Sequence, residues 1–114
     1  MLTIWHNPRC RKSRETLALI EGAGTAVTIR RYLDDAPTAV EIQNILKQLG
    51  FEDPRKLMRK GEAIYKEHGM KTVTDGDILV RYMAENPILI ERPVVTNGKT
   101  AIIGRPPEAV KSLL

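Results

Sequence analysis

The fold is decided by the first 32 residues, MLTIWHNPRCRKSRETLALIEGAGTAVTIRRY. Residues 1–5 form a short apolar run that predicts a strand, and Asn7-Pro8 closes it with a turn signal. Apolar residues then recur at helical spacing until Gly22, and the β-branched stretch 27–32 predicts a second strand. Because two strands joined by a crossover helix are parallel, these residues predict a β-α-β unit.

The rest of the chain predicts a helical block followed by a β-hairpin. Thr38 and Glu41 have the spacing of a capping box at the start of a helix that ends at Gly50. Shorter helical segments follow as far as the helix-breaking Asn86-Pro87, and a last helix is expected at 108–114. Asn97-Gly98 is a strong hairpin turn signal, with strands expected at 94–96 and 100–103.

This order of elements predicts the α/β class, with a small mixed sheet made from the β-α-β unit and the hairpin. At 114 residues the chain has the length of a single domain, 1–114, and the helical block forms an insertion at about 38–86.

The composition excludes several classes of protein. Apolar residues make up 42% of the chain and charged residues 28%, which is typical of a globular protein. No apolar run approaches the roughly 20 residues needed to span a bilayer, and no signal-peptide pattern opens the chain. We therefore expect a cytoplasmic protein with no membrane partner. Because the chain has one cysteine, no internal disulfide is possible, and because its two histidines are far apart in sequence, no metal site is expected.

The net charge is +4, which predicts an anionic partner. One tryptophan, three tyrosines and one phenylalanine leave little material for stacking on bases, so nucleic acid is not expected. A small anionic substrate is the better interpretation.

Cys10 lies between the first strand and the first helix. Helix N-terminal N–H groups and the helix dipole lower a thiol pKa and favour a bound anion there. Several nearby side chains add positive charge: His6, Arg9, Arg11, Lys12 and Arg14. The Ser13 hydroxyl has the spacing to donate a hydrogen bond to the sulfur. A free cysteine is commonly a small buried hydrophobe, but one flanked by two arginines is hard to bury. We therefore expect Cys10 to be a nucleophile in an open, electropositive site. His6 is either an electropositive neighbour of the thiolate or only a strand-end residue.

Several separated motifs carry a resemblance to a known family. They are His6-Asn7-Pro8-Arg9-Cys10 with Ser13-Arg14-Glu15-Thr16-Leu17, then Tyr32-Leu33, Leu57-Met58-Arg59-Lys60, Asn86-Pro87-Ile88-Leu89-Ile90-Glu91-Arg92-Pro93 and Gly104-Arg105-Pro106. In this order, and across nearly the whole chain, they resemble the ArsC arsenate reductases of the glutaredoxin-dependent type. The resemblance implies a thioredoxin-like fold with a cis proline at Pro93.

The same resemblance implies the residues of an active site. Cys10 would be the catalytic nucleophile, and the oxyanion-binding residues would be Arg59, Arg92 and Arg105. Arginine suits this role because it donates hydrogen bonds in pairs to the oxygens of a tetrahedral anion. The residues expected to support the site are His6, Asn7, Ser13 and Pro93.

The activity implied is reduction of arsenate to arsenite by the Cys10 thiolate. Because the chain has no second cysteine, the resolving thiol must come from outside. The family uses glutathione as co-substrate and glutaredoxin as protein partner, with no bound cofactor. The chain lacks the C-terminal extension of the best-understood arsenate reductases, and its loop at residues 9–12 is more basic.

Two alternative functions remain open at this point. A glutathione-dependent thiol or disulfide reductase would need Cys10 but no arsenate pocket. A Spx-like regulator would bind RNA polymerase and act on no substrate. Regulators of that type usually carry a CxxC pair, whereas this chain has Ser13 at the second position.

Overall fold

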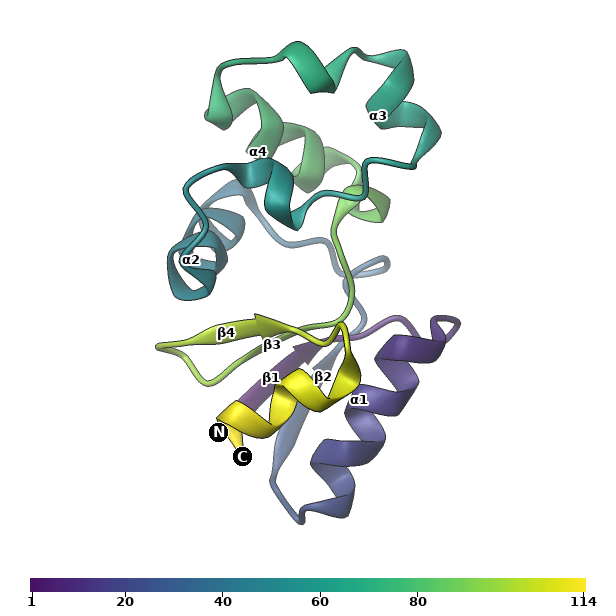
Figure 1. The fold of residues 1–114 in the computed structure, drawn as a ribbon, viewed down its shortest axis with the longest axis vertical. Coiled ribbons are helices and arrows are strands. Elements are labelled where there is room, and N and C mark those ends of the chain that lie inside the picture. The colour runs from purple at the N-terminus through teal and green to yellow at the C-terminus, as the bar shows by residue number, and fades with distance from the viewer. The chain divides into compact units, whose positions relative to one another are not determined.

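The computed structural model describes all 114 residues, Met1–Leu114, as two compact units (Figure 1). The first unit consists of Met1–Asp35 and Arg92–Leu114, and the second of Ala36–Glu91. The expected insertion at about 38–86 falls inside the second unit. The organisation of the chain as a single domain stays a prediction.

The first unit is a mixed four-stranded sheet with helices. Its elements in chain order are β1 (Leu2–Trp5), α1 (Arg11–Gly22), β2 (Val27–Arg30), β3 (Val94–Thr96), β4 (Ala101–Ile103) and a C-terminal 3-10 helix, η4 (Pro107–Leu113). The strand order is β2-β1-β3-β4, in which β1 is parallel to β2 and antiparallel to β3. The β3 and β4 strands form an antiparallel hairpin. The predicted α/β class and mixed sheet are therefore confirmed.

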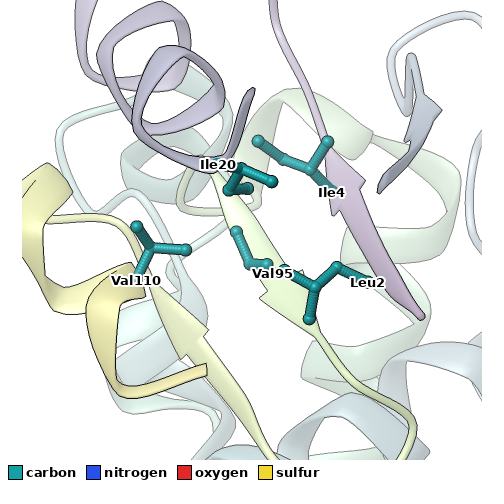
Figure 2. Close-up of a cluster of buried hydrophobic side chains, with 5 residues drawn as sticks. All are labelled: Leu2, Ile4, Ile20, Val95 and Val110. Carbon is teal, nitrogen blue, oxygen red and sulfur yellow. The ribbon is translucent and has the colours of Figure 1, made fainter. Parts of the chain in front are cut away.

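One cluster of buried side chains forms the core of this unit (Figure 2). Leu2 and Ile4 alternate along β1 and so share a face of the sheet. They pack with Ile20 of α1, Val95 of β3 and Val110 of η4, and none of the five is more than 3% exposed. Burying each such side chain stabilises the fold by about 1.5–3 kcal/mol. The cluster therefore fixes α1 against β1, and with it the loop that joins them.

Gly104 lies where the chain leaving β4 passes close to α1. A Cβ atom at this position would lie 2.8 Å from Pro93 Cγ and 3.1 Å from Thr16 Cγ2, and closer still to Thr16 Oγ1. The Gly104 N–H donates to the Pro93 carbonyl at 2.9 Å, which closes the base of the hairpin. The absence of a side chain at Gly104 is thus required by the approach of the backbone to α1.

The second unit is helical. Its elements are α2 (Ala39–Leu49), the 3-10 helix η1 (Pro54–Leu57), α3 (Ala63–Glu67), the 3-10 helix η2 (Met70–Thr72), α4 (Gly76–Glu85) and the 3-10 helix η3 (Pro87–Leu89). The predicted capping box is present: the Thr38 hydroxyl accepts from Glu41 N–H at 3.2 Å, and Glu41 Oε1 accepts from Thr38 N–H at 3.0 Å. None of the helices in the chain has the length and apolar character needed to cross a membrane.

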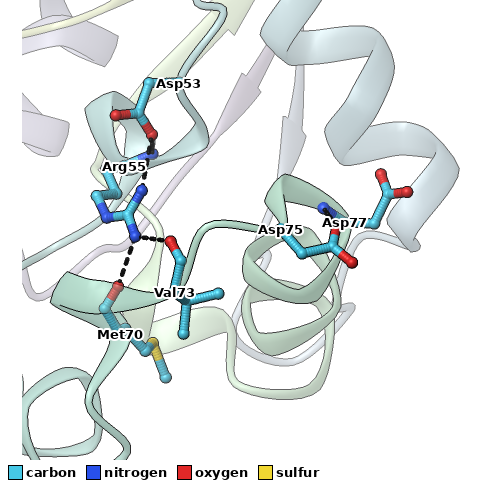
Figure 3. A network of polar contacts seen from close by, with 6 residues as sticks. All are labelled: Asp53, Arg55, Met70, Val73, Asp75 and Asp77. Atoms are coloured by element: carbon cyan, nitrogen blue, oxygen red, sulfur yellow. Dashed lines mark hydrogen bonds and ion pairs between the residues drawn. The ribbon is translucent and has the colours of Figure 1, made fainter.

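The guanidinium group of Arg55 connects three parts of the second unit (Figure 3). Its Nη2 donates to the Met70 carbonyl of η2 at 2.9 Å and also to the Val73 carbonyl. Its Nη1 lies 3.4 Å from Asp53 Oδ1, at the start of η1. Asp75 accepts from the Asp77 N–H and caps the start of α4. Arg55 therefore holds η1 to η2 and to the segment that leads into α4.

Three predicted elements differ in length or type. The final helix, expected at 108–114, is a 3-10 helix at Pro107–Leu113. The second strand ends at Arg30 instead of residue 32, because the Arg31 carbonyl accepts from two N–H groups of a following turn. The sequence also predicts a short helix that starts at Asp53-Pro54 and ends near Gly61, but this helix ends at Leu57, because the Met58 backbone is extended and pairs with Ile90.

Candidate active site

Cys10 is the N-cap residue of α1, with an extended backbone at φ −92° and ψ 122°. Its N–H donates to the Asn7 carbonyl at 3.0 Å, and its carbonyl accepts the first helical hydrogen bond, from Arg14 N–H, at 3.0 Å. The Asn7 side chain accepts from Arg9 N–H at 3.0 Å, and Arg14 Nη1 donates to the Pro8 carbonyl at 3.0 Å. These bonds hold the loop before Cys10 in one conformation, so the position of the sulfur is set by the backbone.

Ser13 does not donate to the sulfur, so the expectation for its hydroxyl is wrong. Its Oγ lies 2.6 Å from His6 Nδ1 and accepts from the Asn7 N–H at 3.0 Å. All three residues are buried. The Ser13 side chain thus fixes the loop through its contacts with His6 and Asn7, and the Ser13 backbone N–H is the group that lowers the pKa of Cys10.

His6 is a buried residue at the end of β1. Burial lowers its pKa, as do the charges of Arg31 and Arg14, while Glu21 opposes the shift. A pKa below the ordinary 6.5 leaves the imidazole neutral at pH 7. Of the two roles left open by the sequence, His6 therefore takes that of a strand-end hydrogen-bonding partner and not of a cationic neighbour.

Cys10 is only 9% exposed, so the site is less open than expected. This burial favours the neutral thiol and would raise the pKa of Cys10. It is outweighed by the Ser13 N–H, the hydrogen bond and charge of Arg92, and the Lys12 N–H, so the pKa lies below its ordinary value. The sulfur makes no conventional capping hydrogen bond, and the effect of these N–H groups is electrostatic. The thiolate form of Cys10 is therefore favoured relative to that of an ordinary cysteine.

Arg92 and Arg105 stand at the two ends of the β3–β4 hairpin, and both meet at Cys10. Arg105 Nη2 lies 3.6 Å from Cys10 Sγ, and Arg105 Nε donates to the Arg92 carbonyl at 2.8 Å. Each arginine is followed by a cis peptide bond, at Arg92-Pro93 and at Arg105-Pro106. The first was expected, but the second was not, because sequence alone gives an X-Pro bond only about a 5–6% chance of being cis.

Arg59, the third predicted arginine, lies in the second unit. Its N–H donates to the Leu89 carbonyl at 2.7 Å, and its Nε pairs with Glu62 Oε1 at 3.0 Å. Its side chain is 25% exposed, which leaves room for a further partner. Its part in binding an oxyanion stays a prediction.

The sequence predicts that Arg30 lies on the protein surface, and this prediction is wrong. Its guanidinium lies 5.9 Å from the centre of the Trp5 ring and pairs with Asp35 at 3.2 Å, and its side chain is 18% exposed. It therefore serves the packing of the first unit. No group of three histidine, cysteine, aspartate or glutamate side chains is arranged to hold a metal ion.

The first unit thus brings together a thiol of lowered pKa, the N-terminus of a 12-residue helix and two guanidinium groups. Helix N-termini and arginine side chains both bind oxyanions, the arginines in a forked geometry that fits two oxygens at once. A thiolate beside such a site can attack the central atom of a bound oxyanion. The arrangement is that of a nucleophilic site for a small tetrahedral anion.

Comparison with known proteins agrees with this chemistry. The sequence model of the ArsC family matches residues 5–113. The chain is 44% identical to a protein named arsenate reductase from Haemophilus influenzae, with 97% of each chain covered. It is 43% identical to one of the same name from Neisseria meningitidis, covering 99% of this chain and 97% of the relative.

A solved structure named arsenate reductase from Vibrio cholerae has the same fold. It superimposes with a TM-score of 0.95 at 45% identity, over 99% of this chain and 97% of that one. The expected thioredoxin-like fold is therefore confirmed. With a family match over almost its full length, the chain belongs to the ArsC family.

Proposed function

We propose that this protein is an arsenate reductase in which the Cys10 thiolate is the nucleophile. The observation that carries the proposal is the 3.6 Å contact between Arg105 Nη2 and the sulfur of a cysteine whose pKa is lowered. The names of the relatives from Haemophilus influenzae and Neisseria meningitidis support arsenate as the substrate. Arg92 and Arg105 bind the arsenate oxygens, and the role of Arg59 as a further oxyanion-binding residue rests on the family resemblance alone.

The first step joins the enzyme to arsenic. The Cys10 sulfur attacks the As(V) centre of dihydrogen arsenate, an S–As bond forms, and one As–O bond breaks. The leaving hydroxyl group takes up the proton that the Cys10 thiol released on ionisation, and it departs as water. The two guanidinium groups stabilise the negative charge on the remaining oxygens, as preorganised donors do in a partly buried site.

The second step is the reduction, and its electrons come from glutathione. A glutathione thiolate attacks the Cys10 sulfur, an S–S bond forms, and the S–As bond breaks with its electron pair left on arsenic. Arsenic leaves as As(III) arsenite, and Cys10 is left as a mixed disulfide. Glutaredoxin then attacks the glutathione sulfur and releases the Cys10 thiolate. The sum is one arsenate and two thiols converted to arsenite, one disulfide and water.

Glutathione is thus a co-substrate, and no bound cofactor takes part. An external reductant is required because Cys10 is the only cysteine of the chain. Glutathione is kept reduced in the cytosol, so this scheme also supports the expected cytoplasmic location.

The test is arsenate-dependent NADPH oxidation with glutathione, glutaredoxin and glutathione reductase. Cys10→Ser should abolish turnover. Arg92→Ala should raise the KM for arsenate about tenfold or more, because a charged hydrogen bond contributes about 1.5–3 kcal/mol. Arg81→Ala, which removes an exposed arginine of α4, is the matched control and should change neither the turnover nor the KM for arsenate.

Two results would contradict the proposal. Turnover that persists in Cys10→Ser would rule out this nucleophile. Wild-type protein that reduces mixed disulfides with glutathione but never arsenate would identify a thiol or disulfide reductase instead.

A further inference from the structure

A cavity of about 190 Å³ lies beside the loop that carries the nucleophile, within the first unit. Residues 6–9 of that loop form one side, and Arg31, Leu33 and Asp34 form the other. Neither Arg92 nor Arg105 lines it. The cavity is therefore separate from the arginines proposed to hold arsenate, although Arg9 directly precedes Cys10 in the chain.

The charged groups of this cavity are not used within the protein. The guanidinium groups of Arg9 and Arg31 form no ion pair or hydrogen bond, and neither does the Asp34 carboxylate. Hydrogen bonds fix the backbone that carries these exposed side chains: the Asp34 N–H donates to the Arg31 carbonyl at 3.0 Å, and the Arg9 N–H donates to the Asn7 side chain. By contrast, the neighbouring Arg30 and Asp35 satisfy each other.

The balance of charge points to a ligand that carries both signs. The two arginines give two positive charges, Asp34 gives one negative charge, and His6 is neutral at pH 7. A ligand with a carboxylate and an ammonium group side by side complements this set. An α-amino acid group has that arrangement, and glutathione carries one on its γ-glutamyl residue.

We propose that this cavity binds the γ-glutamyl end of glutathione. Arg9 and Arg31 take its α-carboxylate, and Asp34 takes its α-ammonium. Leu33, which is 41% exposed, offers an apolar wall to the two methylene groups of the glutamyl side chain. The inference rests on the proposed function, because it assigns a site to the co-substrate of that reaction.

The size of the cavity agrees with one end of the tripeptide. Pockets that enclose a whole small molecule usually have about 300 Å³ or more, whereas this one has about 190 Å³. The cysteinyl and glycyl residues therefore extend outside it. An extended tripeptide spans about 10 Å, and the Cα atoms of the neighbouring residues Arg9 and Cys10 are about 3.8 Å apart. The thiol of a glutathione molecule that is bound through Arg9 is therefore within reach of Cys10. The glycyl end is the poorer occupant, because its lone carboxylate leaves Asp34 unpaired.

The experiment measures binding of S-methylglutathione by isothermal titration calorimetry. This probe has no free thiol, so binding is read without turnover. Arg31→Ala and Asp34→Asn should each weaken binding about three- to tenfold, as expected for charge-assisted hydrogen bonds in a partly exposed site. Arg81→Ala should bind as the wild type does. Circular dichroism and thermal unfolding of each variant establish that it is folded.

Two fragments of the probe identify the end that is bound. γ-Glutamyl-S-methylcysteine, which lacks glycine, should keep most of the affinity. S-Methylcysteinylglycine, which lacks the γ-glutamyl group, should lose it.

The outcomes separate this inference from the proposed function. It is overturned if S-methylglutathione does not bind, if folded Arg31→Ala and Asp34→Asn bind it unchanged, or if the fragment without the γ-glutamyl group binds equally well. It is also overturned if sulfate displaces the probe, since the cavity would then be a general anion site. Cys10-dependent arsenate turnover with unchanged probe binding in both variants would leave the proposed function standing and this inference refuted.

Discussion

Replacing Gly104 with alanine tests how the hairpin is held against α1. Its φ angle is not in the left-handed region, so an alanine suffers no backbone strain. In an open position the same change would stabilise the protein by about 0.4–1 kcal/mol, through the unfolded chain. At Gly104, however, the new methyl group would meet Thr16 and Pro93, the latter at 2.8 Å from Cγ.

The two neighbours can yield only at a cost. Thr16 is buried, and its hydroxyl donates to the Lys12 carbonyl at 2.8 Å. Moving the backbone instead would stretch the 2.9 Å bond from Gly104 N–H to the Pro93 carbonyl. Overpacking costs about 1–3 kcal/mol, and a weakened hydrogen bond about 1 kcal/mol more. After the gain of about 0.4–1 kcal/mol, we expect a net loss of about 1–3.6 kcal/mol.

The assay is urea unfolding followed by circular dichroism, supported by thermal unfolding. A loss of 2 kcal/mol corresponds to a fall in Tm of about 8–16 °C, at about 4–8 °C per kcal/mol. Gly22→Ala is the matched control, since nothing lies within 4 Å of its new methyl group, and it should be neutral or stabilising. Removing the obstacle with Thr16→Ala should give a favourable coupling of about 1 kcal/mol in a double-mutant cycle with Gly104→Ala. If Gly104→Ala is as stable as the wild type, the close approach described above is refuted.

Three further changes test other parts of the structure. Arg92→Ala should raise the pKa of Cys10, measured from thiolate absorbance near 240 nm, whereas Arg81→Ala should leave it unchanged. The pKa of Cys10 in the folded protein lies below its ordinary value, so the ionised thiolate stabilises the fold at a pH above that ordinary value. This stability is lost as the pH falls through the folded-state pKa. The free energy of unfolding of the Arg92→Ala variant should therefore depend less on pH than that of the wild type. Thr38→Ala should destabilise the protein by about 1 kcal/mol in urea unfolding through loss of the capping box, and an unchanged midpoint would contradict that role. Arg55→Ala should cost about 1.5–3 kcal/mol and speed proteolysis within Ala36–Glu91, and equal protease resistance would show that its carbonyl contacts contribute nothing.

The elements with strong local signals could be predicted from the sequence. The apolar run of residues 1–5, the Thr38 capping box and the Asn97-Gly98 turn are each formed by residues close in the chain. Such local preferences agree with the final fold, so they can be recognised without knowledge of the tertiary contacts. The 3-10 form of the last helix could not be predicted, because it depends on how that segment packs against α1 and β4.

Some residues of the site were predicted correctly from the sequence, and the errors concern side chains whose partners are set by the tertiary fold. Cys10 was found because a helix N-terminus is a local property of the chain. The Ser13 hydroxyl has a different partner from the expected one, because the three-residue spacing to Cys10 favours the sulfur, whereas the fold brings His6 Nδ1, seven residues away in sequence, to within 2.6 Å of the Ser13 Oγ. Arg30 was taken for a surface residue, because neither the Trp5 ring beneath it nor its pair Asp35 is apparent from its own position.

Arg92 and Arg105 lie more than 80 residues from Cys10 in sequence, and the fold explains how they meet it. The β3 strand pairs with β1, so that Val94 lies opposite Trp5, and β4 pairs back on β3, so that Ile103 lies opposite Val94. The two ends of the hairpin therefore meet at the end of β1, where the loop to Cys10 begins. Sheet register is strict because a slip of one residue would turn Val95 out of the core. The same buried cluster that stabilises the first unit thus also sets the distance between the guanidinium groups and the sulfur.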